Sequence, residues 1–274
     1  MARTSYFILC GMNIITFLIS MAIVAHVSYA WRLPIQLYGS SPSATFLKTP
    51  ILILGISLLI LSVMGLVALL CHLIFLHRIY LWVILFITIS LLIFIIFSLL
   101  VTNKGPQGIG SSSREFRVNE FSSWMQTHLV GKNHWFDIKK YLLDYEVCDS
   151  FQRKLDALPA AILWEVVTSV ELGCCKPPYS CGYKFKNISY WEVSNSGNES
   201  KEKDCNSWKN DKEILCYDCN SCKAGYLEEV REQWMILNLF NIFFVIYLLI
   251  LFPLGRLSLQ NHPEANHDSY RSPC

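Results

Sequence analysis

The segment Leu172–Gly182 reads LGCCKPPYSCG, with two adjacent cysteines, two prolines and a third cysteine. A disulfide needs Cα atoms roughly 4.4–6.8 Å apart and a defined torsion, so adjacent cysteines do not easily bridge each other. Cys174 and Cys175 must therefore point to two different partners. The chemistry of those partners depends on which side of a membrane the segment occupies, and the rest of the sequence decides that.

Long apolar runs dominate the composition. Hydrophobic residues make up 53% of the 274 residues, charged residues only 16%, and the mean hydropathy is +0.36. A helix needs about 20 apolar residues to cross the hydrocarbon core of a bilayer. Four runs without Asp, Glu, Lys or Arg meet this length, at 6–30, 51–76, 80–101 and 234–252. The sequence therefore predicts an all-α membrane protein with four transmembrane helices.

The first run could also be read as a signal peptide. Ser28-Tyr29-Ala30 matches the small-x-small pattern of a cleavage site. The apolar region of a signal peptide is only about 7–15 residues long, and this run is much longer. We therefore interpret it as an uncleaved span.

The spans leave five further pieces. These are an N-terminus (1–5), a small loop (31–50), a tight turn (77–79), a large loop (102–233) and a tail (253–274). Positive charge does little to orient them. The large loop, however, holds eight of the 11 cysteines: Cys148, Cys174, Cys175, Cys181, Cys205, Cys216, Cys219 and Cys222.

An even number of clustered cysteines indicates a disulfide framework in an oxidising space. The large loop also contains two N-glycosylation sequons, at Asn187 and Asn198. Together these features predict that the loop is extracellular or lumenal and that both termini are cytoplasmic, in the plasma membrane or an endomembrane. Cys10, Cys71 and Cys274 then lie near the inner face and are candidates for palmitoylation. The alternative for Cys10 and Cys71 is a small buried hydrophobe.

Helical patterning continues into the large loop. Apolar residues recur at near-helical spacing over 116–129 and 134–147, and a third helix is predicted from Pro159 to Gly173. Cys174 and Cys175 would leave the end of that helix. The following region, up to Asp211, is poor in aliphatic residues. We expect disulfides to replace core burial there.

Two other chemistries are open to the last cysteines. Cys216, Cys219 and Cys222 have a spacing seen in metal sites, with Cys205 as a possible fourth ligand, and a redox-active thiol pair would fit the same spacing. In an oxidising space we expect disulfides and no metal. Eight cysteines allow 105 pairings, and the residues alone do not choose among them.

Other function classes find little support. The sequence has no His-Glu-x-x-His helix, no Gly-x-Ser-x-Gly elbow and no phosphate-binding glycine loop, so we predict neither an enzyme nor a cofactor. A net charge of +2 without a basic stripe argues against nucleic acid. A small-molecule or ion transporter or channel subunit remains the alternative function, although the four runs lack the charges that usually mark ion pathways.

The arrangement resembles the tetraspanin family over nearly the whole chain. Four spans, a small first loop, a tight inner turn and a large second loop are typical of it. The family's Cys-Cys-Gly motif here reads GCCKPP, at 173–178, which is similar to the plant branch, as is YDCNSCKAG at 217–225. The glycine that follows the cysteine pair in animal members is absent.

This resemblance implies a non-enzymatic scaffold that organises other membrane proteins and tetraspanins, as homo- or hetero-oligomers, into microdomains. A role in plant cell differentiation or cell-cell signalling would fit. It also implies that Cys174 and Cys175 bridge to later cysteines, one to the Cys216–Cys222 cluster and the other to Cys181 or Cys205, with a plant-specific partner for Cys148. Some animal members hold a sterol between spans one and four, so we predict a sterol or lipid site near Asn13, Asn238 and Asn241.

Overall fold

The structure is a computed structural model that describes residues 2–32, 42–71, 73–105, 117–157, 159, 166–187, 190–193 and 203–260. Four of its helices are long and apolar enough to cross a membrane, which confirms the predicted fold class. The chain divides into two compact units. The first comprises Met1–Ser40, Ala44–Phe97 and Leu237–Cys274, and the second comprises Ser41–Ser43 and Ser98–Ile236.

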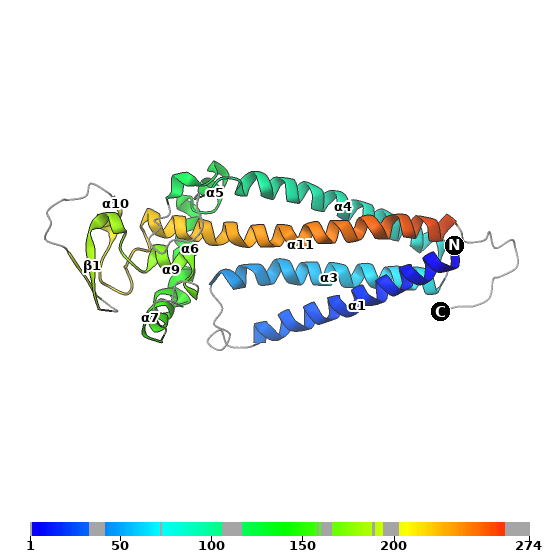
Figure 1. Cartoon of the computed structure of the whole chain (residues 1–274), viewed down its shortest axis with the longest axis horizontal. Helices are drawn as coiled ribbons and strands as arrows, with labels where there is room; N and C mark the ends of the chain where they lie inside the picture. Colours follow the sequence, from blue (N-terminus) through cyan, green and yellow to red (C-terminus); the bar gives the residue numbers. More distant parts are fainter. Residues whose placement is uncertain are drawn as a thin grey trace, which may run out of the picture. The chain divides into compact units, whose positions relative to one another are not determined.

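The first unit is a bundle of long helices that lie side by side (Figure 1). They are α1 (Ala2–Arg32), α3 (Pro42–Leu70), α4 (Ile74–Thr102) and the C-terminal part of α11 (Asn220–Gln260). Their shared core includes Leu9, Leu61, Tyr80 and Leu248. Many outward-facing side chains are large and apolar, as hydrocarbon contact requires.

Several helix ends differ from the expected boundaries, since α3 already begins at Pro42 and α11 at Asn220. Helix α3 ends at Leu70 and α4 begins at Ile74, so the turn expected at 77–79 is wrong and those residues lie inside α4. Helix α11 continues through Pro253, where we expected it to stop. Neighbouring helices can compensate for a proline inside a membrane helix. Pro253 removes the donor for the Leu249 carbonyl, whereas the His77 ring on α4 hydrogen-bonds the Gly255 carbonyl at 2.9 Å and so ties α4 to α11 beyond the proline.

A polar contact joins three helices inside this bundle. The Tyr80 hydroxyl donates to Oδ1 of Asn13 at 3.2 Å, and Nδ2 of Asn13 donates to the carbonyl of Leu9 at 2.9 Å. Gly65 of α3 packs against both side chains, because a Cβ there would lie 2.4 Å from Oδ1 of Asn13. Asn13 is therefore engaged by the protein itself.

The second unit is mainly helical and rich in disulfides. Its helices are η1 (Val118–Glu120), α5 (Ser123–His128), α6 (Lys132–Asp144), α7 (Val147–Ala157), α9 (Ser169–Cys174), η2 (Tyr179–Cys181) and α10 (Lys203–Ser207), followed by the start of α11. The core contains Phe121, Met125, Leu142 and Leu227, with the sulfurs of several cysteines. The aromatic and aliphatic stripes predicted from the sequence supply much of this core.

One helix prediction about the second unit is wrong, and another has a shifted end. A single helix does not run from Pro159 to Gly173, because Thr168 has extended backbone angles and caps the new helix α9. The helix predicted at 134–147 is present as α6 but ends at Asp144, because Glu146 has a positive φ of 47° and α7 begins at Val147. The sequence reasoning also missed a hairpin of β1 (Tyr183–Asn187) and β2 (Tyr190–Val193).

Candidate partner-binding site

The adjacent cysteines of the opening segment bridge in two directions. Cys174 bonds Cys222 at the start of α11, and Cys175 bonds Cys148 in the first turn of α7. The bond from Cys174 to the Cys216–Cys222 cluster agrees with the family resemblance. The implied partner of Cys175 was wrong, since Cys181 and Cys205 bond each other. Cys175 is the C-cap residue of α9.

Glycines bring α9 against α11 so closely that their backbones touch. A Cβ on Gly173 would lie 2.4 Å from the carbonyl oxygen of Ser221, and one on Gly225 would lie 2.3 Å from that of Ser169. The Ser221 hydroxyl donates to the Gly173 carbonyl at 3.1 Å, and the Cys216 N–H donates to the Cys174 carbonyl at 3.1 Å. Gly173 lies inside α9, which ends at Cys174, so the helix stop predicted at Gly173 was wrong. Its lack of a side chain instead lets α9 approach α11 closely enough for the Cys174–Cys222 bond.

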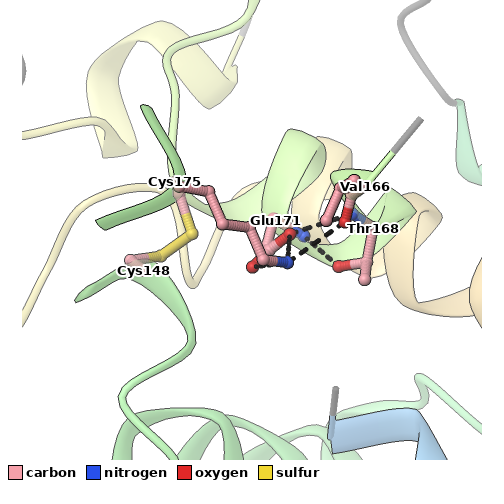
Figure 2. A network of polar contacts seen from close by, with 6 residues as sticks. Cys148, Val166, Thr168, Glu171 and Cys175 are labelled. Carbon is pink, nitrogen blue, oxygen red and sulfur yellow. Dashed lines mark hydrogen bonds and ion pairs between the residues drawn. A yellow bond between two sulfur atoms is a disulfide. The ribbon is translucent and has the colours of Figure 1, made fainter. Parts of the chain in front are cut away.

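A buried ion pair holds the other side of α9. Figure 2 shows Glu171 between Thr168 and the Cys148–Cys175 disulfide. Both Glu171 carboxylate oxygens accept from Lys154 of α7 at 2.9 Å, and one also accepts from the Thr168 N–H. The Thr168 hydroxyl in turn accepts from the Glu171 N–H, which completes a capping box. Lys154 donates further to the Val166 carbonyl.

The region from α7 to the start of α11 therefore forms a stapled frame. Cys216 and Cys219 also bond each other, so every sulfur proposed as a metal ligand or redox thiol is used in a disulfide. Tyr217, between these two cysteines, is buried against the frame. Burial raises the pKa of its phenol to about 12, an effect that a hydrogen bond to the Cys148 backbone partly offsets.

The hairpin is anchored to this frame at both ends. Pro177 and Pro178 are buried, and the Cys181–Cys205 bond closes the segment that contains both strands. Asp204, beside Cys205, accepts from the N–H groups of Asn220 and Ser221 at 2.9 Å and so caps the N-terminus of α11. Asn210 holds β2 through two hydrogen bonds to the Trp191 backbone.

Aromatic side chains stand out from this anchored hairpin. Tyr179 is 86% exposed, Phe185 53% and Tyr190 46%. Tyr183 and Trp191 lie on the same sheet face as Phe185 but nearer the core, since Tyr183 packs on buried Trp208 and Trp191 packs against the core of the unit. The alternating YKFKN of β1 was the sequence signal that could have revealed the strand. Exposed aromatics on a rigid support are suited to protein recognition.

The remaining predicted residues are distributed as follows. Asn187 is the last residue of β1, whereas Ser189 and the whole second sequon at Asn198 lie outside the described residues. Asn238 and Asn241 are buried on α11. Cys10 is free and half-buried. Cys71 is disulfide-bonded, and its palmitoylation stays a prediction. Cys274 lies outside the described residues.

Comparison with known proteins gives a consistent result. The Tetraspanin family model matches residues 5–256. The chain is 31% identical to Tetraspanin-8 of Arabidopsis thaliana, with 98% of this chain and 97% of that protein covered. It is 30% identical to Tetraspanin-5 of the same plant, with 97% and 89% covered, and 31% identical to Tetraspanin-10, with 90% and 84% covered. No solved structure matches.

Proposed function

Because the chain belongs to the tetraspanin family, a family whose members act as membrane scaffolds, we propose that it organises partner membrane proteins laterally into microdomains. The proposed partners are other membrane proteins and tetraspanins, in homo- or hetero-oligomers. The proposed role is non-enzymatic, in plant cell differentiation or cell-cell signalling. The Arabidopsis thaliana relatives support the plant setting.

One observation carries this proposal. A hairpin with exposed aromatic side chains is closed by the Cys181–Cys205 bond and mounted on a frame that three further disulfides hold. A rigid support reduces the conformational entropy that a binding surface loses on association. We propose that partners are chosen on this hairpin, from Gly182 to Asp211.

The proposed topology follows from the same bonds. Four disulfides within the second unit require an oxidising compartment, which favours an extracellular or lumenal position for residues 102–233. Both termini would then be cytoplasmic, in the plasma membrane or an endomembrane. Cys10 would face the acylating side and is the proposed palmitoylation site, and Asn187 and Asn198 are the proposed glycosylation sites.

A paired purification tests the scaffold. The tagged protein is isolated from native plant membranes in mild and in stringent detergent, alongside a Cys181→Ser/Cys205→Ser variant. We expect a defined set of membrane proteins in the mild sample, lost in the stringent one and reduced for the variant. A mild sample without enriched membrane proteins would contradict the scaffold and shift attention to transport assays in reconstituted vesicles.

A membrane lipid, a sterol among the candidates, is a further proposed partner near Asn13, Asn238 and Asn241. The three amides are buried within the helical unit, and the apolar runs 6–30 and 234–252 that contain them have no Asp, Glu, Lys or Arg. Photo-crosslinking with a sterol probe tests the site, with the expectation that Asn13→Leu lowers labelling. Equal labelling of the variant and the parent would argue against it.

A further inference from the structure

The hydrogen-bonding pattern of the hairpin shows which backbone groups point outward. Strands β1 and β2 are antiparallel, with Phe185 opposite Trp191 and Lys184 opposite Glu192. Both the N–H and the C=O of Trp191 bond the side chain of Asn210 at 2.9 Å, so they face away from β1. Phe185 and Trp191 are therefore a non-hydrogen-bonded pair, which agrees with ring centroids only 5.2 Å apart.

The same alternation assigns the outer edge of β1. In an antiparallel pair, opposed residues alternate between hydrogen-bonded and non-hydrogen-bonded pairs. The N–H and C=O groups of Tyr183 and Phe185 consequently point away from β2, as those of Trp191 point away from β1. One donor and one acceptor on each residue are thus available at this edge.

The two edges of the hairpin are not equivalent. At β2 the Asn210 amide, with one donor and one acceptor, takes the place of a peptide group of a third strand. At β1, no residue in the described part of the chain bonds the outward groups of Tyr183 or Phe185. A sheet edge with exposed donors and acceptors is a template for another strand.

The charged side chains of β1 determine which kind of strand can pair with its outer edge. Lys184 and Lys186 are exposed, and Lys186 pairs with Glu192 at 3.3 Å. If a second copy of β1 paired antiparallel with Phe185 opposite Phe185, each Lys184 would face a Lys186. Like charges directly opposite each other destabilise a sheet, whereas opposite charges stabilise it. An incoming strand with carboxylates on this face is therefore favoured over a second copy.

We propose that the outer edge of β1 binds an extended acidic segment of a partner protein as a third strand. Its backbone bonds the outward groups of Tyr183 and Phe185. Its Asp or Glu side chains lie opposite Lys184 and Lys186, and an apolar residue between them covers the exposed Phe185 ring. This rests on the proposed scaffold function and gives its binding surface a defined partner chemistry.

The test uses the full-length protein in lipid nanodiscs and a fluorescent peptide in which Glu alternates with Val. We expect saturable binding by fluorescence anisotropy, and slower hydrogen exchange at the Tyr183 and Phe185 amides in the complex. Lys184→Glu/Lys186→Glu should weaken binding by about tenfold or more. The same variant should gain binding to a peptide in which Lys replaces Glu, and this gain would show that the variant is folded.

Two further variants test whether binding depends on the β1 edge itself. The first controls for the overall change in charge, and the second removes one backbone donor of the edge. Lys132→Glu/Lys140→Glu makes the same charge change on exposed positions of α6 and should leave binding unchanged. Phe185→Pro removes an outward N–H without touching a β1–β2 bond and should weaken binding. Absence of peptide binding, binding without amide protection, or protection that arises from a second copy alone would overturn the inference. Co-purified membrane proteins would still support the scaffold in each of those cases.

Discussion

At the scale of single residues, Gly65 shows how tightly the membrane helices pack. The missing side chain leaves room for Oδ1 of Asn13 and for the Tyr80 ring, whose Cε2 lies 2.9 Å from the position of an added Cβ. We expect Gly65→Ala to lower the stability of the protein in detergent by about 1–3 kcal/mol, as overpacking does. The midpoint of thermal unfolding measures the change.

A double-mutant cycle identifies the cause. Asn13→Ala removes the atom that the methyl group of the Gly65→Ala variant would strike, so the combined variant should lose less stability than the two single variants summed. Strict additivity of the two changes would show that Gly65 acts elsewhere.

In the disulfide-rich unit, Glu171 is the single residue whose substitution we expect to be most informative. It is 3% exposed and accepts from Lys154 and from the Thr168 backbone. Glu171→Gln should reduce stability by about 1–3 kcal/mol, because Lys154 loses its opposite charge in a partly buried position. Glu192→Gln is the matched control, since its pair with Lys186 is exposed and should contribute no more than about 0.5 kcal/mol. Equal thermal midpoints for the two variants would contradict this assignment.

At the scale of elements, helix α11 depends on a carboxylate from another part of the chain. Asp204 accepts hydrogen bonds from two N–H groups in the first turn of α11, where the helix dipole favours negative charge. We expect Asp204→Ala to cost about 1–2 kcal/mol and to speed hydrogen exchange at Asn220 and Ser221. Asp149→Asn, at an exposed ion pair with Lys212, should leave both amides unchanged.

At the scale of the whole molecule, the four disulfides of the second unit have separate tasks. Cys174 and Cys222 are fully buried and close a separation of 48 residues, whereas Cys181–Cys205 closes 24 residues around the hairpin. We expect Cys174→Ser/Cys222→Ser to lose about 4 kcal/mol and to be retained in the secretory pathway. Cys181→Ser/Cys205→Ser should reach the cell surface. Surface biotinylation of the two variants measures the difference, and equal delivery would contradict the division of tasks.

Much of the architecture could be predicted because it depends on local properties. The four spans follow from the length and apolarity of single segments, as in residues 80–101. The need of Cys174 and Cys175 for two partners follows from the geometry of adjacent residues. The clustering of eight cysteines likewise indicated a stapled domain, because clustered cysteines in an oxidising space form disulfides.

The sequence alone therefore determined the membrane-spanning class and the requirement for disulfides. The tertiary structure decided which cysteines meet, because a bond depends on the distance between residues far apart in sequence, such as the 5.1 Å between the Cα atoms of Cys148 and Cys175. It also decided that Asn210 closes the edge of β2, whereas the outward groups of Tyr183 and Phe185 on β1 have no bond within the described residues. An edge exists only once strands pair, so no local pattern in the sequence contains it.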